Sequence, residues 1–201
     1  MLTAKGLVAA RPGLGTWVQP EEAWNVLDPD VLRWLMQRGE YSLVLDDLNQ
    51  LRLAMEPHAA ALAARVLSGE RLGALRTAIG ALDDRALADW RCATDQANAL
   101  KDAYRRLETA VSEDGDVGRA DMEFHREVMR ASGNRFLTLL GGVIEVVLLE
   151  NEVAGRRAAL PCTTSIGHKN VLNAILEGNP ELARSSMAQL LDAMARRNSH
   201  N

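Results

Sequence analysis

Aromatic residues are scarce in this chain of 201 residues, where they make up only 4% of the composition. Ala, Leu and Arg are abundant, and a sequence of this kind favours helices over strands. No apolar run approaches the roughly 20 residues that a membrane-spanning helix needs. The N-terminus also lacks the charged and then apolar pattern of a secretory signal. We therefore expect a soluble, helical protein that is not exported.

Cysteine and excess positive charge are also missing. The two cysteines, Cys92 and Cys162, are single and far apart, so the sequence indicates neither a disulfide framework nor a zinc knuckle. A reducing cytoplasm suits such a chain. The formal net charge of −4 provides no global attraction for nucleic acid or for an anionic membrane, so any contact with DNA must be local. With 47% hydrophobic residues, the chain is long enough for one good core.

The first forty residues differ from the rest. Two β-prone runs surround a Pro/Gly turn within residues 7–18, which predicts a small hairpin. A two-stranded hairpin alone is marginally stable in water, so it needs a partner to pack on. Asp28 and Pro29 are then expected to cap and begin a short helix. Its inward-facing residues would be Leu32, Leu35 and Met36.

Helical periodicity dominates the remainder, and the predicted fold class is an all-α antiparallel bundle preceded by the hairpin. In the first long helix we expect Ser42 as the cap, Pro57 as a kink and Gly69 as the stop. Residues 70–110 should form two helices that meet near 83–84 or near 94–95. The expected helices are 42–67, 116–131, a very apolar helix 135–154, then 164–177 and 180–197, with a loop around 160–161.

The most informative local pattern is Asp121 followed four residues later by His125. On a helix these side chains share one face and can bind one ion. His168, at the head of a later helical segment, would add a third ligand from a facing helix, which is how helical bundles build metal sites. The alternative is that Asp121 is a first-turn helix carboxylate and that each histidine is a hydrogen-bonded core residue.

A series of short motifs extends along nearly the whole chain. They are Gly13-x-Gly15-Thr16-x-Val18, Trp24-Asn25-x3-Pro29, Arg52-x3-Glu56-Pro57, Ala63-Ala64, Asp121-x2-Phe124-His125, Gly133-Asn134, His168-x5-Ala174-Ile175-x2-Gly178-Asn179 and Ala183-x3-Met187. Their order resembles the FadR-like branch of the GntR family. Those proteins are bacterial transcription regulators with an N-terminal winged helix-turn-helix and a C-terminal helical effector domain, the FCD domain. The Trp24 motif is further similar to members that regulate sugar-acid catabolism.

The resemblance implies three parts. Residues 1–22 would be a remnant of the winged helix-turn-helix, 23–40 a linker with a short helix, and 41–198 an FCD-like effector-binding domain. Because the chain starts just before the hairpin, we expect it to be N-terminally truncated, without the recognition helix that would enter the major groove. Weak DNA contacts would come from Arg11, Gly13 and Gly15. The alternative for Arg11, which the absence of the other helices favours, is an ordinary residue of a soluble hairpin. Operator DNA would be a partner only with the full winged helix-turn-helix.

The resemblance also implies a cofactor. Asp121, His125 and His168 would bind a divalent metal, zinc or nickel. Family members offer a fourth ligand, a histidine, at the position of Leu190, so we expect partial occupancy in this chain. The stretch 71–99 is longer than usual for this domain, and we assign no site residue within it.

For the effector, the resemblance implies that Arg52 faces the cavity and clamps the carboxylate of a small organic or sugar acid. By default, Arg52 and Glu56 would form a solvated ion pair along one helix. The expected protein is a cytoplasmic repressor and a homodimer, with the apolar helix 135–154 at its centre or at an interface.

An enzyme is the alternative interpretation, with Asp121, His125 and His168 acting on a small acid. Two histidines and one carboxylate are the ligand set of non-haem iron oxygenases. Those enzymes usually place the ligands on a β-barrel, and this chain has no strands to build one. No nucleotide-binding loop or Ser/His/Asp order suggests another mechanism. We therefore interpret the chain as a regulator and not as an enzyme.

Overall fold

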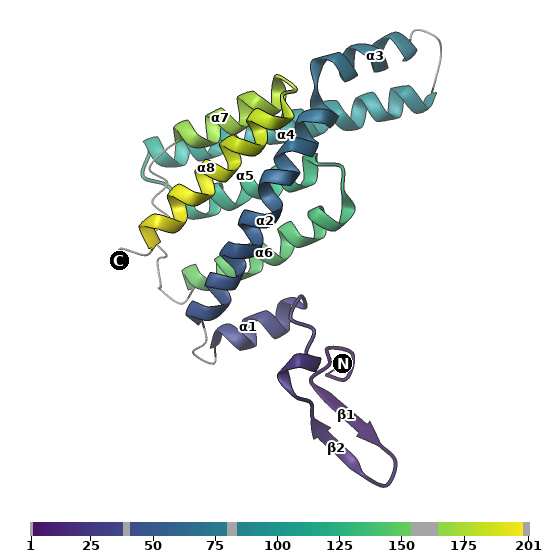
Figure 1. The fold of residues 1–201 in the computed structure, drawn as a ribbon, viewed down its shortest axis with the longest axis vertical. Coiled ribbons are helices and arrows are strands. Elements are labelled where there is room, and N and C mark those ends of the chain that lie inside the picture. The colour runs from purple at the N-terminus through teal and green to yellow at the C-terminus, as the bar shows by residue number, and fades with distance from the viewer. Residues whose placement is uncertain (1, 38–40, 80–83, 154–164, 199–201) are drawn as a thin grey trace.

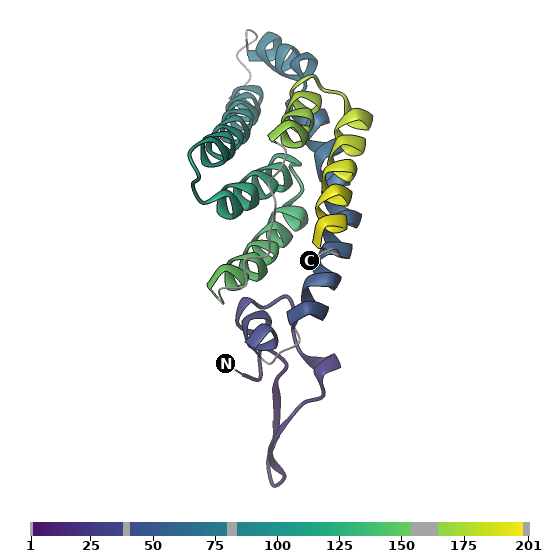
Figure 2. The same ribbon diagram turned by 90° about the vertical axis from the view of Figure 1, so that its left-hand side faces the viewer.

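The computed structural model describes residues 2–37, 41–79, 84–153 and 165–198, and helices account for most of them (Figures 1 and 2). The predicted helical bundle preceded by a hairpin is confirmed. Among the described residues, no helix is long and apolar enough to span a membrane. In chain order the elements are β1 (Val8–Arg11), β2 (Gly15–Val18), the 3-10 helix η1 (Glu21–Ala23), α1 (Pro29–Gln37), α2 (Tyr41–Leu67), α3 (Gly69–Ile79), α4 (Asp84–Ser112), α5 (Val117–Ala131), α6 (Arg135–Val153), α7 (Ser165–Leu176) and α8 (Pro180–Asn198).

The hairpin forms where the sequence predicts it. Strands β1 and β2 pair antiparallel, with Arg11 opposite Gly15 at the closed end. The amide of Leu14 donates to the carbonyl of Arg11 at 3.0 Å, across Pro12 and Gly13. Gly13 has a φ of 80°, which the third position of a type II turn requires and which glycine adopts without strain. The local Pro-Gly pair therefore determines this reversal.

Ion pairs tie the N-terminal segment to α1. Lys5 Nζ lies 2.5 Å from Asp28 Oδ1 and 2.8 Å from Asp30 Oδ2. Asp28 also caps α1 as predicted, since its Oδ1 accepts from the amide of Asp30 at 2.9 Å. The helix packs against α6 and buries four residues, Val31, Leu32, Leu35 and Met36. The three predicted inward-facing residues are among them.

In the bundle, α2 packs against α5, α7 and α8, while α5 also contacts α4 and α6. Figure 2 shows α2 and α8 running side by side along one side of the molecule. A run of buried alanines on α2, which includes Ala59, Ala60, Ala63 and Ala64, presents little side-chain bulk to its neighbours. Larger side chains fill the interior, among them Leu67, Leu100, Leu107, Phe124, Met129, Ile175 and Met187.

The predicted end of α2 at residue 67 is confirmed, but two residues expected at its ends have other places. Helix α2 begins at Tyr41, so Ser42 lies inside it, and Gly69 is the first residue of α3 instead of a stop. Gly69 begins α3 because Ser68 caps this helix. Ser68 Oγ accepts from the amide of Arg71 at 3.2 Å, and this amide of the first turn has no acceptor within the helix. Helix α2 continues through Pro57.

The remaining helix limits agree with the sequence to within a residue or two. The boundary between α3 and α4 falls at the first of the two predicted places, because α3 ends at Ile79 and α4 begins at Asp84. Asp116 caps α5 by accepting from the amide of Arg119 at 3.0 Å. The turn before α8 contains Gly178, whose φ is 70°. The predicted loop around 160–161 and the end of the apolar helix at 154 lie outside the described residues.

Candidate metal and effector site

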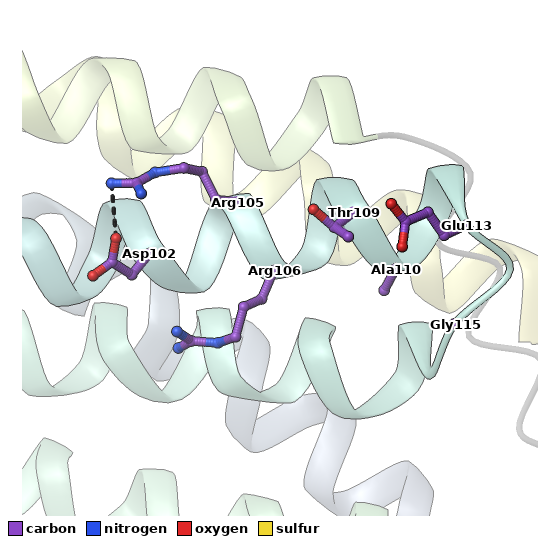
Figure 3. A pocket seen from close by; sticks show the side chains of 7 residues that line it. All are labelled: Asp102, Arg105, Arg106, Thr109, Ala110, Glu113 and Gly115. Atoms are coloured by element: carbon purple, nitrogen blue, oxygen red, sulfur yellow. Dashed lines mark ion pairs between the residues drawn. The ribbon is translucent and has the colours of Figure 1, made fainter.

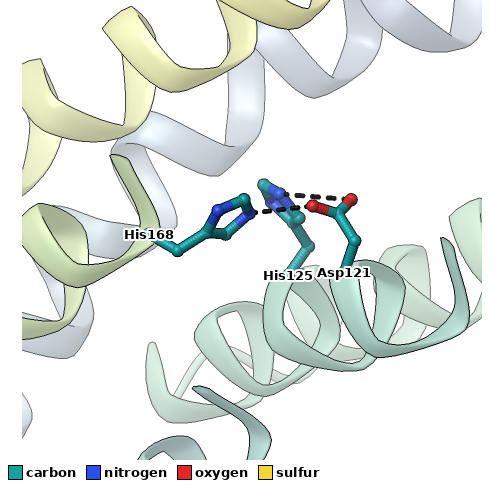
Figure 4. Close-up of side chains that lie close together, drawn as sticks. All are labelled: Asp121, His125 and His168. Carbon is teal, nitrogen blue, oxygen red and sulfur yellow. Dashed lines mark ion pairs between the residues drawn. The ribbon is translucent and has the colours of Figure 1, made fainter. Parts of the chain in front are cut away.

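The structure brings together the three residues of the sequence pattern (Figure 4). Asp121 and His125 lie one turn apart on α5, and His168 reaches them from α7. His168 Nε2 lies 2.9 Å from Asp121 Oδ1, and His125 Nε2 lies 3.8 Å from Asp121 Oδ2. Their potential ligand atoms all lie within 4.8 Å of one another. The residues are buried, with exposed fractions of 0% for Asp121 and 2% for each histidine.

Local packing holds both imidazole rings. Phe124, which is fully buried, meets the ring of His168 edge to face at 5.0 Å and that of His125 at 5.9 Å between ring centroids. Phe124 also contacts Tyr104 of α4 at 6.4 Å. Since aromatic pairs prefer such edge contacts, the core restricts how the histidines can rotate.

A second buried carboxylate, Glu56 of α2, joins the site. Glu56 Oε2 lies 2.5 Å from His125 Nδ1, and Glu56 Oε1 accepts from Arg52 Nε at 2.6 Å. Neither side chain of the Arg52 and Glu56 pair is solvated, because their exposed fractions are 3% and 0%. The default expectation of a solvated ion pair is therefore wrong. Sequence reasoning assigned no site role to Glu56, although its spacing from Arg52 and its place in an apolar helix were visible signals.

The charged groups of the site stabilise one another's ionised forms. Burial alone would raise the pKa of Glu56, but Arg52 and His125 outweigh it and lower this pKa to about 2. Burial would likewise raise the pKa of Asp121, yet the two histidines and Arg52 lower it to about 2. The pKa of Arg52 is raised, because Glu56 and Asp121 outweigh the effect of burial.

Some buried polar atoms of the site have no hydrogen-bond partner among the described residues. They include Arg52 Nη2 and His125 Nε2. Leaving such atoms without a partner costs free energy, and native proteins rarely do so without a functional reason. Two imidazole nitrogens and a carboxylate oxygen are also a donor set that suits a divalent transition metal. The residues present therefore fit a metal ion.

The other residues considered from sequence lie apart from this cluster or offer it no ligand. Leu190 on α8 is 5% exposed and belongs to the apolar core. Arg11, Gly13 and Gly15 are exposed on the hairpin, which extends away from the bundle (Figure 1). His58, on α2, is exposed as expected.

A surface hollow lies where α4 turns into α5, and Arg105 and Arg106 line it (Figure 3). Both cations already have acidic partners. Arg105 Nη2 lies 2.7 Å from Asp102 Oδ1, and Arg106 Nε lies 2.8 Å from Glu123 Oε2. The hollow is open to solvent and its charges are balanced, so the buried cluster is the better candidate for a binding site.

Comparison with known proteins identifies the family. Residues 87–193 match the FCD domain. The uncharacterized HTH-type transcriptional regulator YieP of Escherichia coli is 32% identical over 73% of this chain, which spans 54% of YieP. The galactonate operon transcriptional repressor of Escherichia coli is 23% identical over 98% of this chain and 76% of its own. Among solved structures, Streptococcus agalactiae GntR has a similar fold, with a TM-score of 0.59 and 22% identity over 97% of this chain and 77% of that protein. This chain thus belongs to the FCD-domain branch of the GntR family of transcription regulators.

Proposed function

We propose that this chain is the effector-sensing part of a transcription regulator, and that it binds a small organic or sugar acid through a divalent metal. Asp121, His125 and His168 would hold the metal, and Arg52 would bind the carboxylate of the acid. The observation that carries the proposal is a cluster of metal-ligand atoms enclosed in an otherwise apolar bundle, with a guanidinium beside it. When bound, the metal would supply a positive charge that attracts acidic and hydroxyl oxygens.

The charge of the site supports an acidic effector. Metal binding requires neutral imidazoles, and one guanidinium and two carboxylates would then leave one excess negative charge, which a divalent cation would convert to one excess positive charge. A monocarboxylate would then neutralise the site, and burying an anion without such compensation is costly. Arg52 uses Nε for Glu56, while its Nη2 has no partner among the described residues and remains available to the acid. A planar guanidinium is well suited to a carboxylate.

Sugar acids are the first effectors to test, because one relative is named as the repressor of a galactonate operon. The zinc-loaded and nickel-loaded proteins should be titrated calorimetrically with galactonate and with simpler hydroxy acids. We expect saturable binding that chelation of the metal removes and that the Arg52→Met substitution weakens. Acid binding that persists unchanged after complete removal of the metal would contradict the proposed mode of binding.

The proposal also covers the arrangement of the chain. Residues 1–22 would form the wing of a DNA-binding domain, with Arg11, Gly13 and Gly15 near the DNA backbone. Residues 23–40 would form the linker, and 41–198 the effector domain of a homodimer. Binding of the acid would bias helix packing and thus the spacing of the two DNA-binding heads. The packing of α1 against α6 supports such a path between the hairpin and the bundle.

The enzyme alternative has weaker support. The ligands lie on helices, and the relatives with assigned names are transcription regulators. Incubation of the iron-loaded and zinc-loaded protein with sugar acids under air, followed by product analysis, tests it directly. We expect no turnover, and catalytic turnover that is lost in His125→Ala would favour the enzyme.

A further inference from the structure

Glu56 contacts two different parts of the candidate site at once. Its Oε1 accepts from Arg52 Nε at 2.6 Å, and its Oε2 lies 2.5 Å from His125 Nδ1. Glu56 and Arg52 lie on α2, whereas His125 lies on α5. All three side chains are at most 3% exposed, so water does not compete for these bonds.

The contact with Glu56 determines which nitrogen of His125 carries a proton. An ionised carboxylate can only accept hydrogen bonds, so the proton between these groups must lie on Nδ1 of the imidazole. In the neutral ring the lone pair is then on Nε2. That nitrogen lies 3.8 Å from Asp121 Oδ2 and has no hydrogen-bond partner among the described residues. The tautomer that Glu56 selects is therefore the one that can bind a metal next to Asp121.

The same carboxylate also orients Arg52. Arg52 donates to Glu56 through Nε, the nitrogen nearest its aliphatic chain. Its Nη2 has no hydrogen-bond partner within the described part of the chain. The Glu56 carboxylate thus contacts both a proposed metal ligand, His125, and the proposed effector-binding residue, Arg52.

We propose that Glu56 is the positioning residue of this site, which fixes the tautomer and ring orientation of His125 for metal binding and aims Arg52 at the bound acid. The inference rests on the proposed function for the metal and the acid. It extends that function to a residue outside the ligand set. Partners that hold a metal-binding histidine in this way typically change metal affinity by about 10- to 100-fold when removed.

The decisive variant is Glu56→Gln, which preserves size. A glutamine has only one acceptor oxygen, so it cannot accept from Arg52 and His125 through two separate oxygens as Glu56 does. If its amide faces His125, the amide donates to Nδ1 and forces the proton onto Nε2, where it blocks the metal. We expect zinc affinity, measured by calorimetric titration with zinc alone, to fall about 10- to 100-fold.

The matched control is Glu127→Gln, which changes a buried carboxylate of α5. The ion pairs of Glu127 with Arg126 and Arg130 are both long, at 3.9 Å. Its zinc affinity should equal that of the wild type.

Nitrogen NMR of the imidazoles in the metal-free protein separates positioning from a merely structural role. At a pH where the rings are neutral, wild-type His125 should carry its proton on Nδ1, and Glu56→Gln should populate the Nε2–H form. A wild-type His125 protonated on Nε2 would overturn the proposal without any variant. Unchanged zinc affinity in folded Glu56→Gln would overturn it as well.

The two proposals fail in different ways. If wild-type protein binds no zinc and no nickel, the proposed function fails. The Nδ1–H tautomer would then still test whether Glu56 orients His125. If the wild type binds metal but its His125 tautomer is the other one, the proposed function stands and the role of Glu56 is refuted.

Discussion

Nε2 of His168 lies 2.9 Å from Oδ1 of Asp121, although the two residues belong to α7 and α5. This pair joins the two helices inside the bundle, and His125 completes the cluster from the same face of α5 as Asp121. Among the described residues, no other group of three or more His, Cys, Asp or Glu side chains is close enough to hold a metal. The first predictions concern this cluster.

Replacement of His125 by alanine should abolish binding of zinc and nickel, because it removes one of the three proposed ligands, Asp121, His125 and His168. Elemental analysis of the purified protein and calorimetric titration are the measurements. The control is His58→Ala, which removes an exposed histidine of α2 and should leave metal content unchanged. Equal metal content in wild type and His125→Ala would show that His125 is a packing residue.

Substitution of Leu190 by histidine should tighten divalent metal binding by at least about tenfold, equivalent to roughly 1.4 kcal/mol. The reason is the resemblance to FCD-domain regulators, which implies a histidine ligand at this position of the last helix. Titration with zinc tests the prediction. Leu191→His is the matched control, since Leu191 is the next residue of α8 and is 4% exposed, compared with 5% for Leu190. Equal affinities of the two variants would contradict a ligand role at position 190.

The helical domain should form a homodimer. Phe136 and Leu139 of α6 are 72% and 70% exposed, and residues three apart share a helix face. Light scattering at micromolar concentration should give twice the monomer mass, and Leu139→Asp should shift the protein towards the monomer. Leu182→Asp, at another exposed apolar residue, on α8, should not. A clean monomer mass for the wild type would refute the dimer.

The ion pair of Lys5 with Asp28 should be visible in a pH titration. The hydrogen bond from Lys5 is the main cause that lowers the pKa of Asp28 below its ordinary value of 3.8. Because the pKa is lower in the folded state, the pair stabilises the fold above that ordinary value, and this contribution is lost as the pH falls through the lowered pKa. Carbon NMR of the carboxyl should show the pKa rising in Lys5→Met. It should stay the same in Lys101→Met, and an identical pKa in all three proteins would refute the assignment.

Truncation of Phe124 to alanine should lower the free energy of unfolding by about 3 to 5 kcal/mol, since it leaves a cavity in a fully buried position. Urea denaturation is the measurement. Val111→Ala, at a residue of α4 that is 40% exposed, should change stability by no more than about 0.5 kcal/mol. A similarly small loss for Phe124→Ala would show that the core repacks without leaving such a cavity.

Much of the fold is determined by local sequence. The Pro12-Gly13 pair specifies the hairpin turn, Asp116 specifies the start of α5, and the four-residue spacing of Asp121 and His125 places both on one helix face. These features depend on backbone geometry and on hydrogen bonds within a few residues. They could therefore be predicted before the structure was known.

Gly69 begins α3 instead of serving as the stop of α2, and two local signals compete at this point. Glycine often follows a helix, whereas serine often precedes one, and here the side chain of Ser68 satisfies the start of α3. Periodicity alone does not decide between the two arrangements.

Only the tertiary structure decided the surroundings of the site. Glu56 and His125 are 69 residues apart, and their contact depends on how α2 packs against α5. The same packing excludes water from the Arg52 and Glu56 pair, which the sequence alone would leave as an ordinary solvated ion pair. A residue's own side chain and its near neighbours set its helix and its face. Burial, charge balance and the choice of histidine tautomer depend on groups that come from other helices, and no local pattern encodes them.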